Sequence, residues 1–562
     1  MQIKGAEAVM ESLIKENANT VFGYPGGAIM ITYDALYDYQ NKIRHVLTRH
    51  EQGAIHAAQG YARATGKVGV CFATSGPGAT NLITGLADAL MDSTPIVCIT
   101  GQVASPLLGS DAFQETDVVG ISMPVTKWNI QVKNAEDVPD AISKAFYIAS
   151  SGRPGPVLVD ITKDAQAGIC NFDYKHTTKV RSYIPETLIN RESALAAAEI
   201  INKAQKPFLV YGQGVVLGGA EEELKVFIEK TGIPSAWTLL GADALPSDHP
   251  LNVGMLGMHG NLGPNKKTNE CDVLIAVGMR FDDRVTGDLS TYAKQAKVIH
   301  LEIDPAEINK NVIADFPVLG NAKKSLRLLN ELVVERNHDE WLAEFREYDK
   351  IEYEAVIDKA LYPSDGEITM GEAVRIVNEI AGQDSVLVTD VGQQQMIANR
   401  YFKHSESHTC ITSGGMGTMG FGLPAALGAQ VGVPNKTVVL VVGDGGIQMT
   451  IQELTTLAQE NAKVKILLLN NGYLGMVRQW QQLFFNKRYS STPMFNPDFV
   501  KVAEGCHIAG KRVAEREDLK NAIEEMINHD GAFLLEVKVK AEENVFPMTP
   551  AGATCSEMLL GE

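Results

Sequence analysis

The 562-residue sequence contains no apolar run that approaches the roughly 20 residues of a membrane-spanning helix. Its N-terminus also lacks the hydrophobic segment of a secretory signal and the Arg- and Ser-rich character of a transit peptide, because helical patterning starts at Ala6. We therefore expect a cytoplasmic protein that binds no membrane.

Positive charge and closely spaced cysteines are also scarce. Lys and Arg number 50 against 68 Asp and Glu, which gives a formal net charge of −18 and argues against a nucleic-acid partner. The seven cysteines lie far apart and form no C-x-x-C pair. We expect reduced, mostly buried thiols.

Alternating strand and helix patterns are present instead, in three blocks without an internal repeat or a low-complexity tract. A chain of this length usually forms two to four domains. A polar linker at 175–192 and a charged helical region at 326–357 separate the blocks. We predict an α/β protein of three domains, each a mostly parallel sheet flanked by helices. The predicted domains span 1–175, 190–325 and 366–540, followed by a tail at 541–562.

The most informative motif lies in the third block. Gly443-Asp444-Gly445 follows an apolar strand pattern at 437–442, and Asn470-Asn471 follows a second one at 464–469, with helical spacing from Met449 to Ala458 between them. A right-handed β-α-β crossover brings the carboxyl ends of both strands to one edge of the sheet. Carboxylate and amide oxygens suit Mg²⁺, and glycines let a phosphate approach the backbone. A helix cap explains Gly-Asp-Gly alone, but the complete pattern favours a metal and phosphate site.

This segment resembles the cofactor motif of thiamine diphosphate enzymes. The resemblance implies that Mg²⁺ is bound by Asp444, Asn471 and the backbone carbonyl of Tyr473. Further segments match the same family in order, including Ala112 to Glu115 and Gly417 to Gly422. The residues that the resemblance places against thiamine diphosphate are Tyr24, Glu51, Thr74, Pro77, Asn81, Val391, Gly392, Gln393, Gln394, Met419, Gly443, Asp444, Gly445, Gly446, Asn471, Gly475 and Met476.

Glu51 follows a predicted strand and opens a helix. By itself it is explained as an acid in the first turn that complements the helix dipole. In the thiamine diphosphate family, a Glu at this place donates a proton to the pyrimidine ring of the cofactor. The resemblance therefore implies that Glu51 is the activating acid, with a pKa raised by an apolar pocket.

The central block resembles the FAD-binding domain of the acetolactate synthase family, large catalytic subunits of the biosynthetic branch. The similarity rests on Gly254 to Gly260, on Arg280-Phe281-Asp282-Asp283-Arg284, and on a strand at 298–303 that ends in Asp304-Pro305. The residues implied as FAD contacts are Arg153, Gly212, Gly214, Thr238, Leu239, Met258, His259, Gly260, Arg280, Arg284, Glu302, Ile303 and Asp304.

The resemblance covers essentially the whole chain and implies an activity. Pyruvate would be decarboxylated and the hydroxyethyl carbanion added to pyruvate or 2-ketobutyrate, the first common step of valine, leucine and isoleucine biosynthesis. The implied catalytic residues are Glu51, Gln114, Arg280 and Trp480, with Arg280 on the carboxylate of the second 2-ketoacid and Trp480 facing its pocket. FAD would do no net redox chemistry. A homodimer or tetramer with a shared active site and a small regulatory subunit are also implied.

The sequence departs from the family at two places. Gln394 stands where the family usually has His, and Met416 stands where it usually has Leu. The alternatives are an FAD-dependent pyruvate oxidase, a catabolic acetolactate synthase without FAD, and a non-catalytic protein of the same fold. Trp480 and the segment from Arg280 to Arg284 favour the biosynthetic branch. A non-catalytic protein would have lost Glu51 or the metal ligands.

Overall fold

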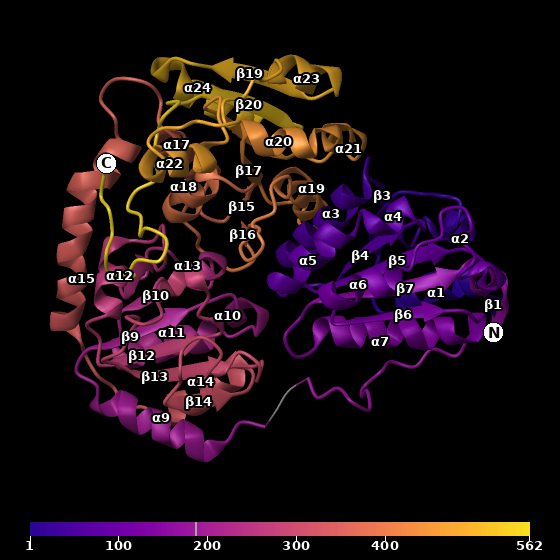
Figure 1. The fold of residues 1–562 in the computed structure, drawn as a ribbon, viewed down its shortest axis with the longest axis horizontal. Helices are drawn as coiled ribbons and strands as arrows, with labels where there is room; N and C mark the ends of the chain where they lie inside the picture. Colours follow the sequence, from indigo (N-terminus) through magenta and orange to yellow (C-terminus); the bar gives the residue numbers. More distant parts are fainter. Residues whose placement is uncertain (186–187, 562) are drawn as a thin grey trace.

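The computed structural model describes residues 1–185 and 188–561 and folds into three α/β domains (Figure 1). Each domain has a six-stranded sheet in which every strand pair is parallel, flanked by helices. The predicted fold class is confirmed. Residues 186 and 187 of the predicted linker lie outside the described residues.

The first domain contains the sheet β3-β2-β4-β5-β7-β6. Its central strands are buried along their whole length, which accounts for their continuous apolar sequences. A short strand that the sequence did not predict precedes α1 and pairs with β8, so the N-terminus is tied to the end of the domain. The elements are β1 (Gln2–Lys4), α1 (Gly5–Lys15), β2 (Thr20–Gly23), α2 (Met30–Tyr39), β3 (Arg44–Leu47), α3 (Glu51–Thr65), β4 (Gly69–Ala73), α4 (Pro77–Thr80), α5 (Ile83–Met91), β5 (Ile96–Gln102), α6 (Val118–Ser122), β6 (Trp128–Val132), α7 (Val138–Ser150), β7 (Pro156–Thr162), α8 (Lys163–Ala167) and β8 (Ile169–Asn171).

The central domain contains the sheet β11-β10-β9-β12-β13-β14. The predicted boundary at Ser325 falls inside α14 and is wrong, because Leu326 and Leu329 of that helix pack into the core of this domain. The elements are α9 (Arg191–Lys203), β9 (Pro207–Tyr211), α10 (Gly214–Leu217), α11 (Glu221–Thr231), β10 (Ser235–Trp237), β11 (Asn252–Met255), α12 (Leu262–Thr268), β12 (Val273–Val277), α13 (Asp283–Thr286), β13 (Lys297–Glu302), β14 (Phe316–Leu319) and α14 (Ala322–Leu332).

The charged region after α14 is not one helix. It divides into α15 (Asp339–Glu352), a π-helical segment (Tyr353–Ile357) and α16 (Asp358–Leu361). Trp341 and Phe345 of α15 are buried against the central domain, so this connection is part of the fold.

The third domain contains the sheet β16-β15-β17-β18-β20-β19. The helix predicted between the two motif strands is divided into α20, a 3-10 turn (Ile451–Glu453) and α21, with the interruption at Thr450, whose hydroxyl donates to the Gly420 carbonyl. The elements are α17 (Met370–Ala381), β15 (Val386–Thr389), α18 (Gln393–Tyr401), β16 (Cys410–Ile411), α19 (Gly422–Gly432), β17 (Val438–Gly443), α20 (Asp444–Met449), α21 (Leu454–Gln459), β18 (Lys465–Asn470), α22 (Gly475–Phe484), α23 (Phe499–Gly505), β19 (Ala509–Val513), α24 (Arg516–Asn528) and β20 (Phe533–Lys538).

Helices α3 and α19 join the first and third domains, and they lie side by side in Figure 1. Glycines make this close crossing feasible. A Cβ at Gly60 would lie 1.9 Å from the Ala425 carbonyl oxygen, and one at Gly428 would lie 1.8 Å from that of Ala57. The two backbones are therefore in direct contact.

The tail leaves the third domain and returns to the central one. The Thr549 amide donates to the Met258 carbonyl, the Asp288 amide donates to the Ala553 carbonyl, and Cys555 is buried in a core cluster of the central domain. All seven cysteines are free thiols and all but Cys506 are buried, as expected. Within the described residues, no helix has the length and hydrophobicity to cross a membrane. The cytoplasmic location stays a prediction.

Candidate active site

A cavity of about 710 Å³ opens between the central and third domains, with first-domain residues at one side. It is lined by most of the third-domain and central-domain residues that the sequence singled out. Those residues are Val391, Gly392, Gln393, Gln394, Met419, Gly443, Asp444, Gly445, Gly446, Asn471, Tyr473, Gly475, Met476, Trp480, Gly214, Thr238, Leu239, Met258, His259, Arg280, Arg284, Glu302 and Ile303. Arg153 of the first domain also lines the cavity.

The predicted cation ligands converge at one end of this cavity. β17 and β18 are parallel neighbours, with Gly443 opposite Leu469, so Asp444 and Asn471 leave the sheet at the same edge. Both side chains are buried, and burial raises the pKa of the Asp444 carboxyl. The set contains one carboxylate, one amide oxygen and the Tyr473 carbonyl, which fits Mg²⁺, because this ion takes oxygen ligands and shares them with phosphates and water.

The described residues contain no cluster of three His, Cys, Asp or Glu side chains of the kind that holds a metal without further partners. A cation at Asp444 would therefore depend on ligands from a bound phosphate group, as Mg²⁺ sites commonly do.

Glycines form the wall beside the cation ligands. A Cβ at Gly475 would lie 2.2 Å from the Gln393 side-chain oxygen, and one at Gly446 would lie 2.3 Å from the Asp390 carboxylate. No other residue fits these positions without displacing a buried polar side chain. Both glycines line the cavity, where backbone without side chains suits a diphosphate.

Gln393 and Gln394 of α18 differ in how many hydrogen bonds hold their side chains. The Gln393 amide donates to Gln479 and to the Glu543 carbonyl and also accepts from Asn471, so it holds a predicted cation ligand in place. Gln394 donates to the Asp390 carbonyl over 3.3 Å, and its side chain lies against Gly443. Gln394 thus lies beside the turn that carries Asp444, and its amide carries no charge.

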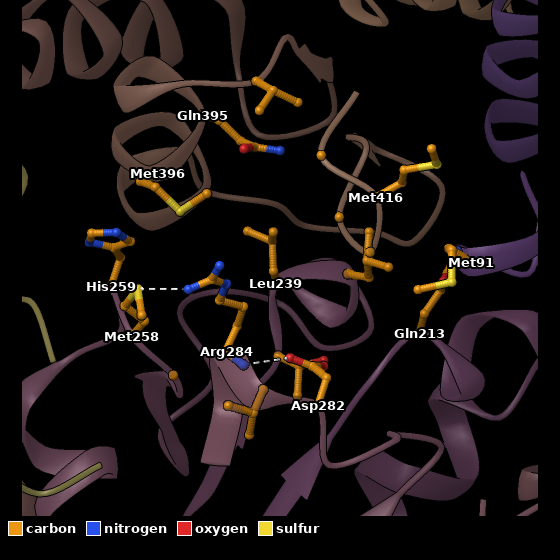
Figure 2. Close-up of a pocket in the computed structure, with 18 of the residues that line it drawn as sticks. Met91, Gln213, Leu239, Met258, His259, Asp282, Arg284, Gln395, Met396 and Met416 are labelled. Carbon is orange, nitrogen blue, oxygen red and sulfur yellow. Dashed lines mark hydrogen bonds between the residues drawn. The ribbon is translucent and has the colours of Figure 1, made fainter. Parts of the chain in front are cut away.

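The central-domain half of the cavity fits a flavin nucleotide. Figure 2 shows Arg284 extending toward Met258 and His259, with its guanidinium 3.5 Å from the Met258 sulfur. His259 is buried and its Nδ1 has no hydrogen-bond partner among the described residues. Burial, with the nearby charges of Arg400 and Arg284, lowers the pKa of His259 to about 3, so the ring is neutral. The turn after β9 packs directly on the one after β12, where a Cβ at Gly214 would lie 2.5 Å from Gly278.

Three of the expected FAD residues do not line the cavity. Gly212 and Gly260 instead permit close backbone packing. The Asp304 carboxylate forms an ion pair of 3.2 Å with Arg153 of the first domain. The acidic residue that faces the cavity at the end of β13 is Glu302, and burial raises the pKa of its carboxyl to about 7.

Arg280 and Trp480 both line the cavity, as predicted. Arg280 reaches the glycine-rich segment after β16, because a Cβ at Gly415 would lie 3.3 Å from its guanidinium. Trp480 is half-buried and packs against Phe484 on α22, with ring centroids 5.0 Å apart.

The other predicted first-domain residues, apart from Arg153, form a separate group. Asn81 donates to the Glu51 carboxylate over 2.9 Å, and the Thr74 hydroxyl accepts from the Ala28 amide. A Cβ at Gly76 would lie 2.9 Å from the Gln114 carbonyl. Tyr24, Glu51, Thr74, Pro77, Asn81 and Gln114 are all described, and none of them lines the cavity that contains Asp444.

Several site residues carried no signal in the sequence. Met91, Gln213, Gln395 and Met396 line the cavity and are visible in Figure 2. Asn496 contacts the Asp444 carboxylate from an irregular loop. Gln213 lies between the predicted residues Gly212 and Gly214, and Gln395 directly follows the predicted Gln394.

The comparisons with known proteins agree with this geometry. Three family models match: the N-terminal TPP binding domain of thiamine pyrophosphate enzymes at 3–121, their central domain at 195–329, and their C-terminal TPP binding domain at 390–537. The acetolactate synthase isozyme 2 large subunit of Escherichia coli K12 is 47% identical, with 99% of each chain covered. An acetolactate synthase large subunit of Corynebacterium glutamicum is 45% identical over 99% of this chain and 90% of its own. The chain belongs to the acetolactate synthase large subunit family of thiamine pyrophosphate enzymes.

Proposed function

We propose that this chain is a catalytic subunit that decarboxylates pyruvate and joins the remaining two-carbon unit to pyruvate or 2-ketobutyrate. The observation that carries the proposal is one cavity lined by the Asp444–Asn471–Tyr473 oxygen set and by the His259–Arg284 flavin-type pocket. The relatives named acetolactate synthase, similar over 99% of this chain, support the same reaction.

Thiamine diphosphate supplies the electron sink for the loss of CO₂ from a 2-ketoacid. The chain's own residues bind and orient it. Asp444, Asn471 and Tyr473 would hold Mg²⁺ against the diphosphate, and the glycines at 443, 445, 446 and 475 leave room for its oxygens. Glu51 would hold a proton at the pyrimidine ring.

Arg280 and Trp480 would select the second substrate. Arg280 presents a fixed positive charge that matches a carboxylate. Trp480 offers an apolar face where 2-ketobutyrate carries one methylene more than pyruvate, a difference that discriminates by roughly 1–3 kcal/mol in a hydrophobic pocket. FAD would occupy the central-domain half of the cavity without net redox chemistry.

A complete active site would need two copies of the chain. The Glu51 group lies outside the cavity that contains Asp444. Apolar side chains are exposed beside both groups, including Phe113 next to Gln114 and Phe495 next to Asn496. Exposed apolar surfaces commonly mark protein interfaces. A symmetric dimer would bury the surface at Phe113 and the surface at Phe495, and it would bring Glu51 of one copy to Asp444 of the other. The relatives are named large subunits, and we propose a small regulatory subunit as a further partner.

Product analysis tests the reaction. Pyruvate should give acetolactate, and added 2-ketobutyrate should give acetohydroxybutyrate, with thiamine diphosphate, Mg²⁺ and FAD present and no oxygen uptake. Oxygen uptake without a condensation product would identify a pyruvate oxidase instead. Full activity in FAD-free protein would place the chain in the catabolic branch.

Co-expression of two inactive variants tests the shared site. Glu51→Gln and Asp444→Ala homodimers should be almost inactive, whereas each mixed dimer contains one site with both residues intact. Random pairing should restore roughly a quarter of wild-type activity if the dimer is symmetric. No recovery in purified mixed dimers would show that each site is built within one chain.

A further inference from the structure

The segment at 492–496 lies along the loop that carries the cation ligands. The Leu474 amide donates to the Thr492 carbonyl over 2.9 Å, and the Met494 amide donates to the Gly472 carbonyl over 2.8 Å. Tyr473 and Pro493 form an antiparallel bridge between these contacts. The position of Asn496, at the end of this segment, is therefore fixed relative to the loop after β18.

Asn496 makes the closest contact that Asp444 receives from another side chain. Its Nδ2 donates to the Asp444 Oδ2 over 2.6 Å and to the Asn470 Oδ1 over 3.1 Å. Its Oδ1 accepts from the Gln448 amide over 3.0 Å, and Gln448 donates in turn to the Asp444 carbonyl. Asn496 thus contacts residues at the ends of both motif strands.

These contacts fix the orientation of the Asp444 carboxylate. Oδ2 of Asp444 also accepts from the Gly472 amide over 3.0 Å, so two donors from different segments hold the same oxygen. Rotation of the carboxyl group would break both hydrogen bonds inside a buried site, where an unmade hydrogen bond costs about 1–3 kcal/mol. A carboxylate fixed in this way offers its other oxygen, Oδ1, in one direction.

We propose that Asn496 is a positioning residue of the cation site, which acts through Asp444 and makes the site favour Mg²⁺ over Ca²⁺. Mg²⁺ demands near-octahedral geometry at short ligand distances, whereas Ca²⁺ accepts longer and more variable ones. A carboxylate that turns freely still suits Ca²⁺ but suits Mg²⁺ less well. The inference rests on the proposed binding of Mg²⁺ with thiamine diphosphate at Asp444.

The test compares the two ions in the Asn496→Ala variant of the full chain. Dissociation constants for Mg²⁺ and for Ca²⁺ are measured calorimetrically at saturating thiamine diphosphate, without substrate. Loss of a group that orients a metal ligand typically weakens metal binding about 10- to 100-fold, and we expect a loss of this size for Mg²⁺. The loss for Ca²⁺ should be less than about threefold, because its coordination tolerates the freed carboxylate.

Gln481→Ala provides the matched control. Gln481 holds the same segment, accepting from the Thr492 hydroxyl over 2.8 Å and donating to the Ser490 carbonyl over 3.0 Å, without contacting Asp444. Its constants for both ions should match wild type. Far-ultraviolet circular dichroism verifies that both variants are folded.

Four results would overturn the inference. If Asn496→Ala weakens the binding of Mg²⁺ and Ca²⁺ equally, the segment at 492–496 has moved as a whole. If the dissociation constant for Mg²⁺ is unchanged, Asn496 is not part of the site. If Gln481→Ala loses as much Mg²⁺ affinity as Asn496→Ala, the effect belongs to the segment as a whole and not to Asn496. Wild-type protein that binds thiamine diphosphate with neither ion would overturn the proposed function, and the inference with it.

Discussion

Replacing Gly60 with Ala should separate the first and third domains where α3 crosses α19. The added Cβ would lie 1.9 Å from the Ala425 carbonyl oxygen, 2.6 Å from its carbon and 2.7 Å from its Cα. Ordinary contact begins at 3.4 Å, so the first of these distances falls short by about 1.5 Å. All three atoms belong to backbone, and no side-chain rotation can relieve the overlap.

The expected cost follows from this overlap. Overpacking a well-packed core typically costs about 1–3 kcal/mol, and the rigid helices put Gly60→Ala at the upper end. Ala is favoured over Gly within a helix by about 1 kcal/mol, which offsets part of the loss. We expect a net destabilisation of about 2 kcal/mol or more. Because α3 begins at Glu51 and α19 follows Met419, activity should fall as well.

Urea unfolding followed by circular dichroism measures the effect as a shift of the midpoint. Gly505→Ala is the matched control, because Gly505 ends α23 and a Cβ there meets no atom within 4 Å. The control should unfold at the wild-type midpoint or slightly above it. A Gly60→Ala midpoint at or above that of wild type would refute the direct backbone contact between α3 and α19.

Four further changes test individual residues. Asp444→Ala should greatly weaken binding of thiamine diphosphate with Mg²⁺, and unchanged affinity in a titration would place the site elsewhere. Glu51→Gln should keep fold and cofactor affinity but slow hydrogen–deuterium exchange at the cofactor C2 by about 10²–10⁴, and wild-type exchange would exclude a role for Glu51. Trp480→Leu should keep acetolactate formation and lose most of the preference for 2-ketobutyrate, and an unchanged product ratio at fixed 2-ketoacid concentrations would make Trp480 a packing residue. Burial raises the pKa of Asp160 from 3.8 to about 6, so the folded state holds a proton that the unfolded state has lost, and stability falls as pH rises through this window by roughly 3 kcal/mol. Urea midpoints of Asp160→Asn should therefore fall less than those of wild type between pH 4 and 7, and parallel slopes would contradict the assignment.

The parts of the site that follow regular elements were predictable. Asp444 and Asn471 converge because a right-handed crossover fixes where two consecutive parallel strands end, and both strands are recognisable as apolar runs. The glycines beside them were recognisable because they follow the same strands, and a Cβ at Gly446 or Gly475 would collide with the Asp390 or Gln393 side chain.

Other parts depend on tertiary contacts that no local pattern encodes. Asn496 lies in an irregular loop, and only the pairing of that loop with residues 472–474 brings it to Asp444. Glu302 ends β13 and Asp304 follows it by two residues. Asp304 pairs with Arg153 of the first domain, whereas Glu302 lines the cavity, and no local pattern distinguishes the two acids. The predicted end of the central domain is too early because the sequence of α14 is rich in charge and resembles a linker. Only the packing of Leu326 and Leu329 in the core shows that the helix belongs to the domain.

The return of the tail to the central domain has a consequence for synthesis on the ribosome. The core cluster around Phe281 and Tyr292 includes Cys555, and residues near 288 pair with Ala553. Domains generally fold in order as the chain emerges, but this one cannot close its core until the whole third domain has been translated. The apolar side chains of this incomplete core therefore stay exposed in the middle of the nascent chain during translation. We expect chaperones to bind mainly there.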